Sequence, residues 1–187
     1  GKYGSTKVLL ISSYFGSRLL AIQLQLSGKN SVAKSSIYTD ILIANPSEPK
    51  IFPAFKVLDK LQHENFGLMY DTCHGQMLGV VGARQQGEKE VVKDQLELIS
   101  KFSGRINHIH LIDSDNTCHK DADGNDETSA HPPFGDGILD FDQIVPVLAK
   151  ENIGHDWWTV DLCFWPEAWD ATEKCKSALD GLVSKYG

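Results

Sequence analysis

The segment Ile106–Asp115, Ile-Asn-His-Ile-His-Leu-Ile-Asp-Ser-Asp, alternates polar and aliphatic side chains and then ends in two carboxylates. Successive side chains of a β-strand point to opposite faces, so His108 and His110 share one face, and Asn107, Ile109 and Leu111 share the other. Of His110 and Asp113, one could be a metal ligand and the other could orient it. The segment therefore predicts a strand whose carboxyl end carries a metal site.

Two further strand-like segments end in the same kinds of residue. Tyr70–His74 reads Tyr-Asp-Thr-Cys-His, and Thr159–Cys163 reads Thr-Val-Asp-Leu-Cys. Asp71, His74 and Asp161 thus join the histidine-rich segment as candidate site residues. Carboxylates and imidazoles gathered at three strand ends suit a divalent ion.

Each candidate also has a simpler structural interpretation. Asp71 or Thr72 could cap a helix and leave His74 exposed. An ion pair could satisfy Asp161, whose burial without a partner would cost about 2–7 kcal/mol. His131 could place its ring over the site or could be a solvated histidine of the proline- and glycine-rich loop that follows it.

Outside these segments the chain alternates strands and helices. The predicted strands are Lys7–Ser12, Ile37–Ala44, Phe66–Tyr70, Ile106–Ile112 and Trp157–Cys163. The predicted helices are Phe55–Gln62, Glu88–Phe102, Leu139–Lys150 and Pro166–Lys185, and residues 113–137 are expected to form a polar loop. Strands separated by helices predict βαβ units and a parallel sheet, in which ligands bind at the carboxyl ends of the strands.

The composition narrows the classes of function. With 187 residues and a net charge of −7, the chain fits one acidic globular domain and is a poor match to nucleic acid, whose recognition depends on Lys and Arg. It contains no apolar run near the roughly 20 residues that a membrane span needs. Its four cysteines form no Cys-x-x-Cys pair, which favours free thiols and a cytoplasmic location.

The motifs resemble those of the xylose isomerase-like TIM-barrel superfamily, which includes sugar-phosphate isomerases and epimerases, inosose dehydratases and endonuclease IV. The resemblance covers residues 45–187. The segments that carry it are Gly67–His74, Ile109–Ser114, His131 with Phe134–Gly137, and the strand that ends at Asp161.

The resemblance implies a divalent metal (Mn, Co, Mg or Zn) held by a Glu, an Asp, a His and a final Glu from successive late strands. Asp71 matches the Asp, and His110 matches the His. Asp161 stands where the final Glu is usual and keeps its charge on a shorter side chain. Asp40 is the carboxylate nearest to the position of the first Glu.

The remaining histidines match other roles in the superfamily. His74 matches a histidine that binds substrate or a further metal, and His131 matches a ligand of an additional metal in endonuclease IV. Ser129 stands where that enzyme has an aspartate, and this departure weighs against DNA repair together with the acidic charge.

The resemblance implies an α/β fold of the (β/α)8 TIM-barrel type. Such a barrel takes about 250 residues, and about 200 at the lower end. The four clear β/α units in residues 37–187 make about half a barrel, and residues 1–36 stay poorly assigned. The expected partner is therefore either a missing N-terminal half-barrel or a second copy of the chain in a homo-oligomer.

The implied function is a metal-dependent sugar or sugar phosphate isomerase or epimerase, acting by proton transfer next to a metal-bound carbonyl. The expected substrate is a small polyhydroxylated compound. Asp161, His74 and His131 are the expected catalytic and substrate-binding residues. The alternatives are a metal-dependent dehydratase of the inosose or dehydroshikimate type, and an inactive truncated relative that binds only a ligand or partner.

Overall fold

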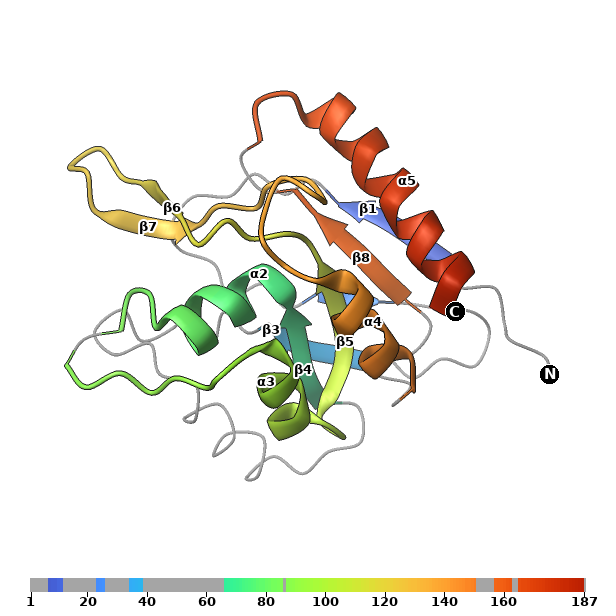
Figure 1. Cartoon of the computed structure of the whole chain (residues 1–187), viewed down its shortest axis with the longest axis horizontal. Helices are drawn as coiled ribbons and strands as arrows, with labels where there is room; N and C mark the ends of the chain where they lie inside the picture. Colours follow the sequence, from blue (N-terminus) through green and yellow to red (C-terminus); the bar gives the residue numbers. More distant parts are fainter. Residues whose placement is uncertain are drawn as a thin grey trace.

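A computed structural model gives the conformation of most of the chain (Figure 1). It describes residues 66–85, 87–150, 157–162 and 165–186, together with the backbone of the strands at 7–11, 23–25 and 34–38. The predicted helix Phe55–Gln62 lies outside the described residues. So does Asp40, with the rest of the predicted strand beyond residue 38.

Six strands form one sheet in the order β1-β8-β5-β4-β3-β2. Their bounds are β1 Lys7–Ile11, β2 Gln23–Gln25, β3 Lys34–Tyr38, β4 Phe66–Asp71, β5 Ile106–Leu111 and β8 Trp157–Asp161. All neighbouring pairs are parallel except β2 and β3, which are antiparallel. The predicted parallel α/β arrangement is confirmed for the described strands, with an antiparallel strand added at one edge.

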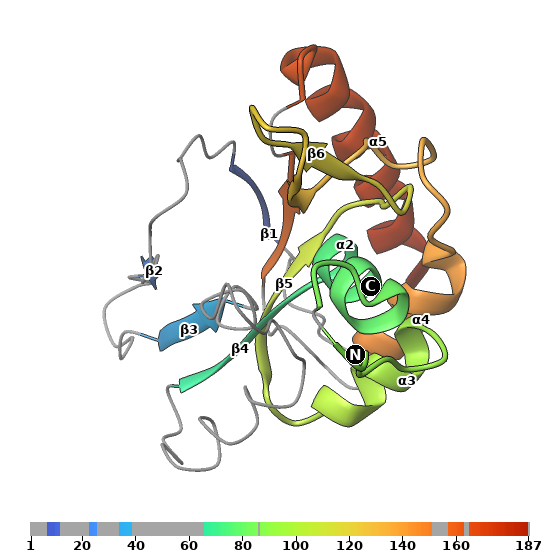
Figure 2. The ribbon, with the colours of Figure 1, turned by 90° about the vertical axis from the view of Figure 1, so that its left-hand side faces the viewer.

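The described helices cover a single face of this sheet, as Figure 2 shows. They are α2 Thr72–His74, the π-helix η2 Gly75–Val81, α3 Gln95–Phe102, α4 Phe141–Lys150 and α5 Ala168–Tyr186. The two-residue period of the strands explains which side chains meet them. Tyr70, Ile109 and Val160 point into the core against the helices, whereas their neighbours Asp71, His110 and Asp161 point to the opposite face.

Helix α3 is shorter than the predicted helix Glu88–Phe102. Asp94 has an extended backbone, and its carboxylate accepts a hydrogen bond of 2.9 Å from the Glu97 N–H, so the helix begins there. Residues 88–93 are not helical, and Val91 is 49% exposed instead of facing the core. The apolar spacing predicts one buried face made of Val91, Val92, Leu96, Ile99 and Phe102. This was right for Val92, Ile99 and Phe102, which are buried, and wrong for Val91.

The expected polar loop at 113–137 contains a β-hairpin, so this prediction was wrong in part. Strands β6 Cys118–Lys120 and β7 Asp126–Ser129 pair in antiparallel fashion. The Asp121 carboxylate closes the turn by accepting from the Asp123 and Asn125 N–H groups. These strands are short and polar, so they lack the alternation by which a strand is recognised in sequence.

The other element boundaries differ by a few residues. Helix α4 begins at Phe141, where the prediction had Leu139, and α5 begins at Ala168, where it had Pro166. Strand β8 ends at Asp161, two residues before its predicted end. Among the described residues, no helix is both long enough and apolar enough to cross a membrane.

Candidate metal centre

Asp71 is the last residue of β4 and lies wholly buried at the start of α2. Its Oδ1 accepts a hydrogen bond of 2.8 Å from the His74 N–H, so it caps the helix as the simpler interpretation predicted. The same cap places His74 beside the carboxylate, where its side chain is half-buried. Asp71 therefore combines a structural bond on one oxygen with a second oxygen, Oδ2, that is available to a ligand.

The neighbouring strands bring two more candidates to Asp71. His110 lies directly across from Asp71 in the β4–β5 register, and β8 follows β5 in the sheet. The His110 Nδ1 atom lies 3.2 Å from Asp161 Oδ2 and 3.7 Å from Asp71 Oδ2. One ligand atom from each residue lies within 4.8 Å of the others. We call Asp71, His110 and Asp161 the strand-end group.

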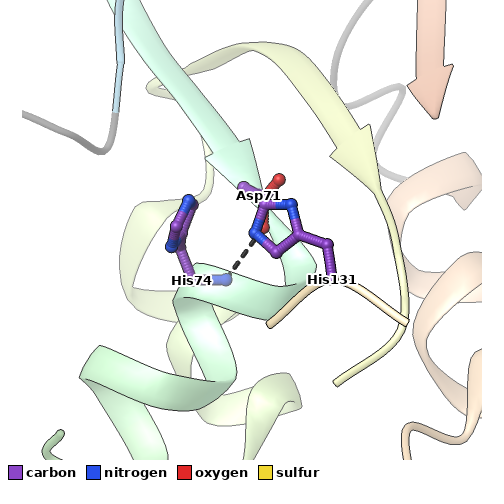
Figure 3. A group of neighbouring side chains, drawn as sticks. All are labelled: Asp71, His74 and His131. Carbon is purple, nitrogen blue, oxygen red and sulfur yellow. Dashed lines mark hydrogen bonds between the residues drawn. The ribbon is translucent and has the colours of Figure 1, made fainter. Parts of the chain in front are cut away.

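A second group shares Asp71 and includes His74 and His131, again with ligand atoms within 4.8 Å of one another. Figure 3 shows the two imidazoles gathered around the Asp71 carboxylate at the start of α2. The His74 and His131 rings pack edge to face with centroids 4.7 Å apart. His131 is 1% exposed, which excludes the interpretation of a solvated loop histidine. We call this set the histidine group.

The surroundings set the protonation of these side chains. Burial raises the pKa of Asp161, but the hydrogen bond from His110 and the His110 charge are the main effects that outweigh it, so the net pKa is lowered. Burial lowers the pKa of His131 although the Asp71 charge opposes this shift. The result favours an ionised carboxylate and a neutral imidazole, the forms that bind metals.

His108 shares a strand face with His110 but has another role. Its Nε2 lies 3.1 Å from the Thr159 hydroxyl, and its ring contacts the His110 ring edge to face with centroids 5.2 Å apart. Burial, followed by the His110 charge, lowers the pKa of His108 to about 4. His108 is therefore a neutral neighbour that packs below His110.

Asp113, the other candidate beside His110, holds a loop. Both of its oxygens accept hydrogen bonds from backbone N–H groups, including those of Gly135, Gly137 and Leu139. This role was not recognisable in the sequence, because these three loop residues are more than 20 positions away.

Sequence reasoning also missed two contacts that orient the site. The Ser129 hydroxyl lies 3.2 Å from His74 Nδ1, and the Thr72 hydroxyl bonds to both backbone groups of Ile112. A Thr directly after the strand-ending Asp71 was the only signal for the second of these contacts.

The buried polar atoms test whether a cation suits these residues. Within the described part of the chain, Asp71 Oδ2, Asp161 Oδ1 and both ring nitrogens of His131 are buried without a hydrogen-bond partner. Leaving buried polar atoms unbonded is costly, and two facing carboxylates repel one another. A divalent cation bound by oxygen and imidazole nitrogen would remove both costs. The donor set fits a metal such as Mn, Co, Mg or Zn.

The structure thus brings together five of the six candidate residues, and Asp40 lies outside the described residues. A search of curated proteins returned no match. A family model described as a xylose isomerase-like TIM barrel matches residues 44–180, well over half of the chain. This agrees with the resemblance seen in the motifs. The chain therefore belongs to the xylose isomerase-like TIM-barrel family.

Proposed function

We propose that this protein is a divalent-metal-dependent isomerase or epimerase that acts on a small sugar or sugar phosphate. The observation that carries the proposal is the strand-end group, in which two carboxylates and an imidazole from three adjacent parallel strands lie within 4.8 Å. Membership of a family that includes sugar isomerases and epimerases supports the reaction class.

Asp71, His110 and Asp161 would hold the metal, with Asp40 as the proposed fourth ligand. When bound, the metal would polarise a substrate carbonyl and so make the proton on the neighbouring carbon easier to remove. These ligands lie at the carboxyl ends of the strands, which is where barrel enzymes of this type bind their substrates. The proposed architecture is the C-terminal half of such a barrel, completed by an N-terminal half or by a second copy.

Asp161 is the proposed proton acceptor and donor. Its Oδ2 is held by His110 at 3.2 Å, which fixes the carboxylate, while Oδ1 has no hydrogen-bond partner among the described residues. An ionised carboxylate with one oxygen held and one oxygen free can accept a proton and return it.

His74 and His131 are the proposed contacts to substrate hydroxyl groups. A neutral imidazole has one donor and one acceptor nitrogen, so it can bind a hydroxyl in either direction. Both ring nitrogens of His131 are without a hydrogen-bond partner among the described residues, and the ring lies against His74. Two adjacent imidazoles could therefore orient neighbouring hydroxyls of a polyhydroxylated substrate.

The test combines metal analysis with a proton-exchange assay. Purified protein reloaded with Mn, Co, Mg or Zn should hold about one equivalent per chain, because the strand-end group supplies one set of ligands. Aldoses and ketoses incubated in D₂O should gain deuterium next to the carbonyl. Asp71→Asn should lose metal and exchange, whereas Asp123→Asn, an exposed turn carboxylate, should keep both.

Other outcomes point to the alternatives. Loss of water from the substrate, with formation of an unsaturated product, would identify a dehydratase that removes the same proton. Metal content below about a tenth of an equivalent after reloading would overturn the enzyme proposal and favour a relative that only binds a ligand or partner.

A further inference from the structure

Asp113 is a buried carboxylate whose hydrogen bonds go to the backbone of a distant loop. It follows β5 and is 1% exposed. Its Oδ1 accepts from the Ser114 and Leu139 N–H groups at 2.8 and 3.0 Å, and its Oδ2 accepts from Gly135 and Gly137 at 2.9 and 3.2 Å. A buried carboxylate with this many donors fixes their positions, because each bond is charge-assisted.

The loop fits against Asp113 without spare room. A Cβ atom built on Gly137 would lie 2.3 Å from Asp113 Oδ1 and 2.5 Å from the Ser114 carbonyl oxygen. The Ile138 N–H donates to that same carbonyl at 2.8 Å. The loop is therefore pinned to the end of β5, three residues beyond His110.

The other end of the loop is also held. The Ala130 N–H donates to the Thr117 carbonyl at 3.0 Å, and the Ala130 carbonyl accepts from the Cys73 thiol at 3.0 Å. Phe134 is buried and packs against Phe141 with ring centroids 4.5 Å apart. His131 lies between these two attachments, so its backbone is fixed from both sides.

The ring of His131 does not set its own position through hydrogen bonds. Both of its nitrogens are buried and lack a hydrogen-bond partner among the described residues. Its neighbours are the His74 ring and the Asp71 carboxylate, from the histidine group. What places the ring there is the path of the loop that carries it.

We propose that Asp113 is a positioning residue for the histidine group: its carboxylate fixes residues 135–139 so that the His131 ring is held beside His74 and Asp71. The β5 strand would then serve the site twice, through His110 directly and through Asp113 by way of the loop. This inference rests on the proposed function only where metal binding is used to detect it.

The first arm of the test uses the metal-free chain of residues 1–187. The ring ¹⁵N signals and the His74–His131 proton contact are recorded by NMR for the wild type, Asp113→Asn and Gly137→Ala. The second variant keeps the charge but forces the loop away from Asp113, and it serves if Asp113→Asn fails to fold. Asp136→Asn is the control, because Asp136 lies in the same loop but is exposed and pairs with Lys174 on the surface.

We expect both test variants to shift the His131 ring signals and weaken the contact to His74, while the His110 signals and the control stay unchanged. Wild-type signals in both variants would overturn the proposal. So would an equal change in Asp136→Asn, because any disturbance of the loop would then suffice.

The second arm adds Zn²⁺ alone and follows the same signals. Here Zn²⁺ serves as a probe of the histidine group, whose ligand atoms also lie within 4.8 Å of one another. Disturbing a residue that orients a metal ligand costs about 10–100-fold in affinity, so Asp113→Asn should raise the Zn²⁺ midpoint of the His131 signal about tenfold or more and leave that of His110 unchanged. Equal midpoints for the variant and the wild type would count against the role. If Zn²⁺ shifts neither signal in the wild type, the proposed function fails, and the metal-free spectra still decide on Asp113.

Discussion

At the scale of single residues, one hydroxyl joins the ends of the strands that carry Asp71 and His110. The Thr72 Oγ1 donates to the Ile112 carbonyl at 2.6 Å and accepts from the Ile112 N–H at 2.9 Å. All of these groups are buried, so neither backbone group has water as a substitute partner. Thr72 therefore links the segments that directly follow β4 and β5, beyond the last paired residues of the two strands.

Replacing this hydroxyl should be costly. Thr72→Val keeps the shape of the side chain but leaves the Ile112 N–H and C=O unbonded, so we expect the free energy of unfolding to fall by about 1–3 kcal/mol. Urea denaturation measures the change. Thr72→Ser keeps the hydroxyl and should lose clearly less, and equal losses in the two variants would show that the methyl group matters instead.

At the scale of elements, the late start of α3 gives the adjacent residues Val91 and Val92 different exposures. Val92 is buried, and its N–H donates to the Gly79 carbonyl at 2.8 Å, while Val91 is 49% exposed. A helix beginning at Glu88 would have buried both. The Asp94 cap shifts the helix start, so only one of the two contributes to the core.

Alanine substitutions at these positions should differ in their effects. Val92→Ala removes two buried methyl groups and should lower the free energy of unfolding by about 2 kcal/mol, with a contribution from the cavity. Val91→Ala should change it by less than about 0.5 kcal/mol. Denaturant unfolding of the two variants measures both changes. Similar losses of unfolding free energy in Val91→Ala and Val92→Ala would mean that α3 begins earlier in solution.

Helix α5 carries a buried thiol, that of Cys175, which makes the free energy of unfolding vary with pH in the alkaline range. Burial raises the pKa of Cys175 above its usual value of 9.0, although a hydrogen bond with the Phe134 backbone opposes this shift. As the pH rises through about 9, the unfolded chain loses the thiol proton and the folded chain keeps it. The unfolded state then binds fewer protons, so the free energy of unfolding falls with rising pH.

We expect this decline to be less steep in Cys175→Ala than in the wild type. The comparison uses the slope between neutral pH and about pH 10, because the alanine also removes packing at every pH. Ser177→Ala, an exposed position of the same helix, is the control and should follow the wild type. Parallel curves for the wild type and Cys175→Ala would contradict the raised pKa.

At the scale of the whole molecule, the strand-end group joins β4, β5 and β8, so its occupancy should stabilise the sheet. A ligand present at about a hundred times its Kd adds about 2.7 kcal/mol to the free energy of unfolding. For a chain of this size that corresponds to a rise in Tm of about 5–10 °C. Melting curves with EDTA and with excess Mn²⁺ or Zn²⁺ measure it.

The variant Asp71→Asn is the matched comparison for this experiment. It keeps a side chain that can still cap α2 through its oxygen but loses the charge shared by both groups. We expect its Tm to be the same with EDTA and with metal. A rise equal to that of the wild type would mean that the cation binds elsewhere.

The sequence by itself determined the parallel α/β arrangement and the best candidates for the site. Period-two patterns and their polar ends are local, so β4, β5 and β8 could be predicted together with Asp71, His110 and Asp161 at their ends. The family followed from the same motifs, and the family model that matches residues 44–180 confirms it.

Only the tertiary structure decided which residues surround that site and how they are held. The contacts of His74 with Ser129 and of Asp113 with Gly137 join residues 55 and 24 positions apart, and no local pattern encodes them. They depend on the path of the β6–β7 hairpin and the loop after it, whose short polar segments have no periodicity. The local pattern of apolar and polar side chains determined where the strands end. The later segment at residues 118–139, which packs against those strand ends, determined the environment of the site.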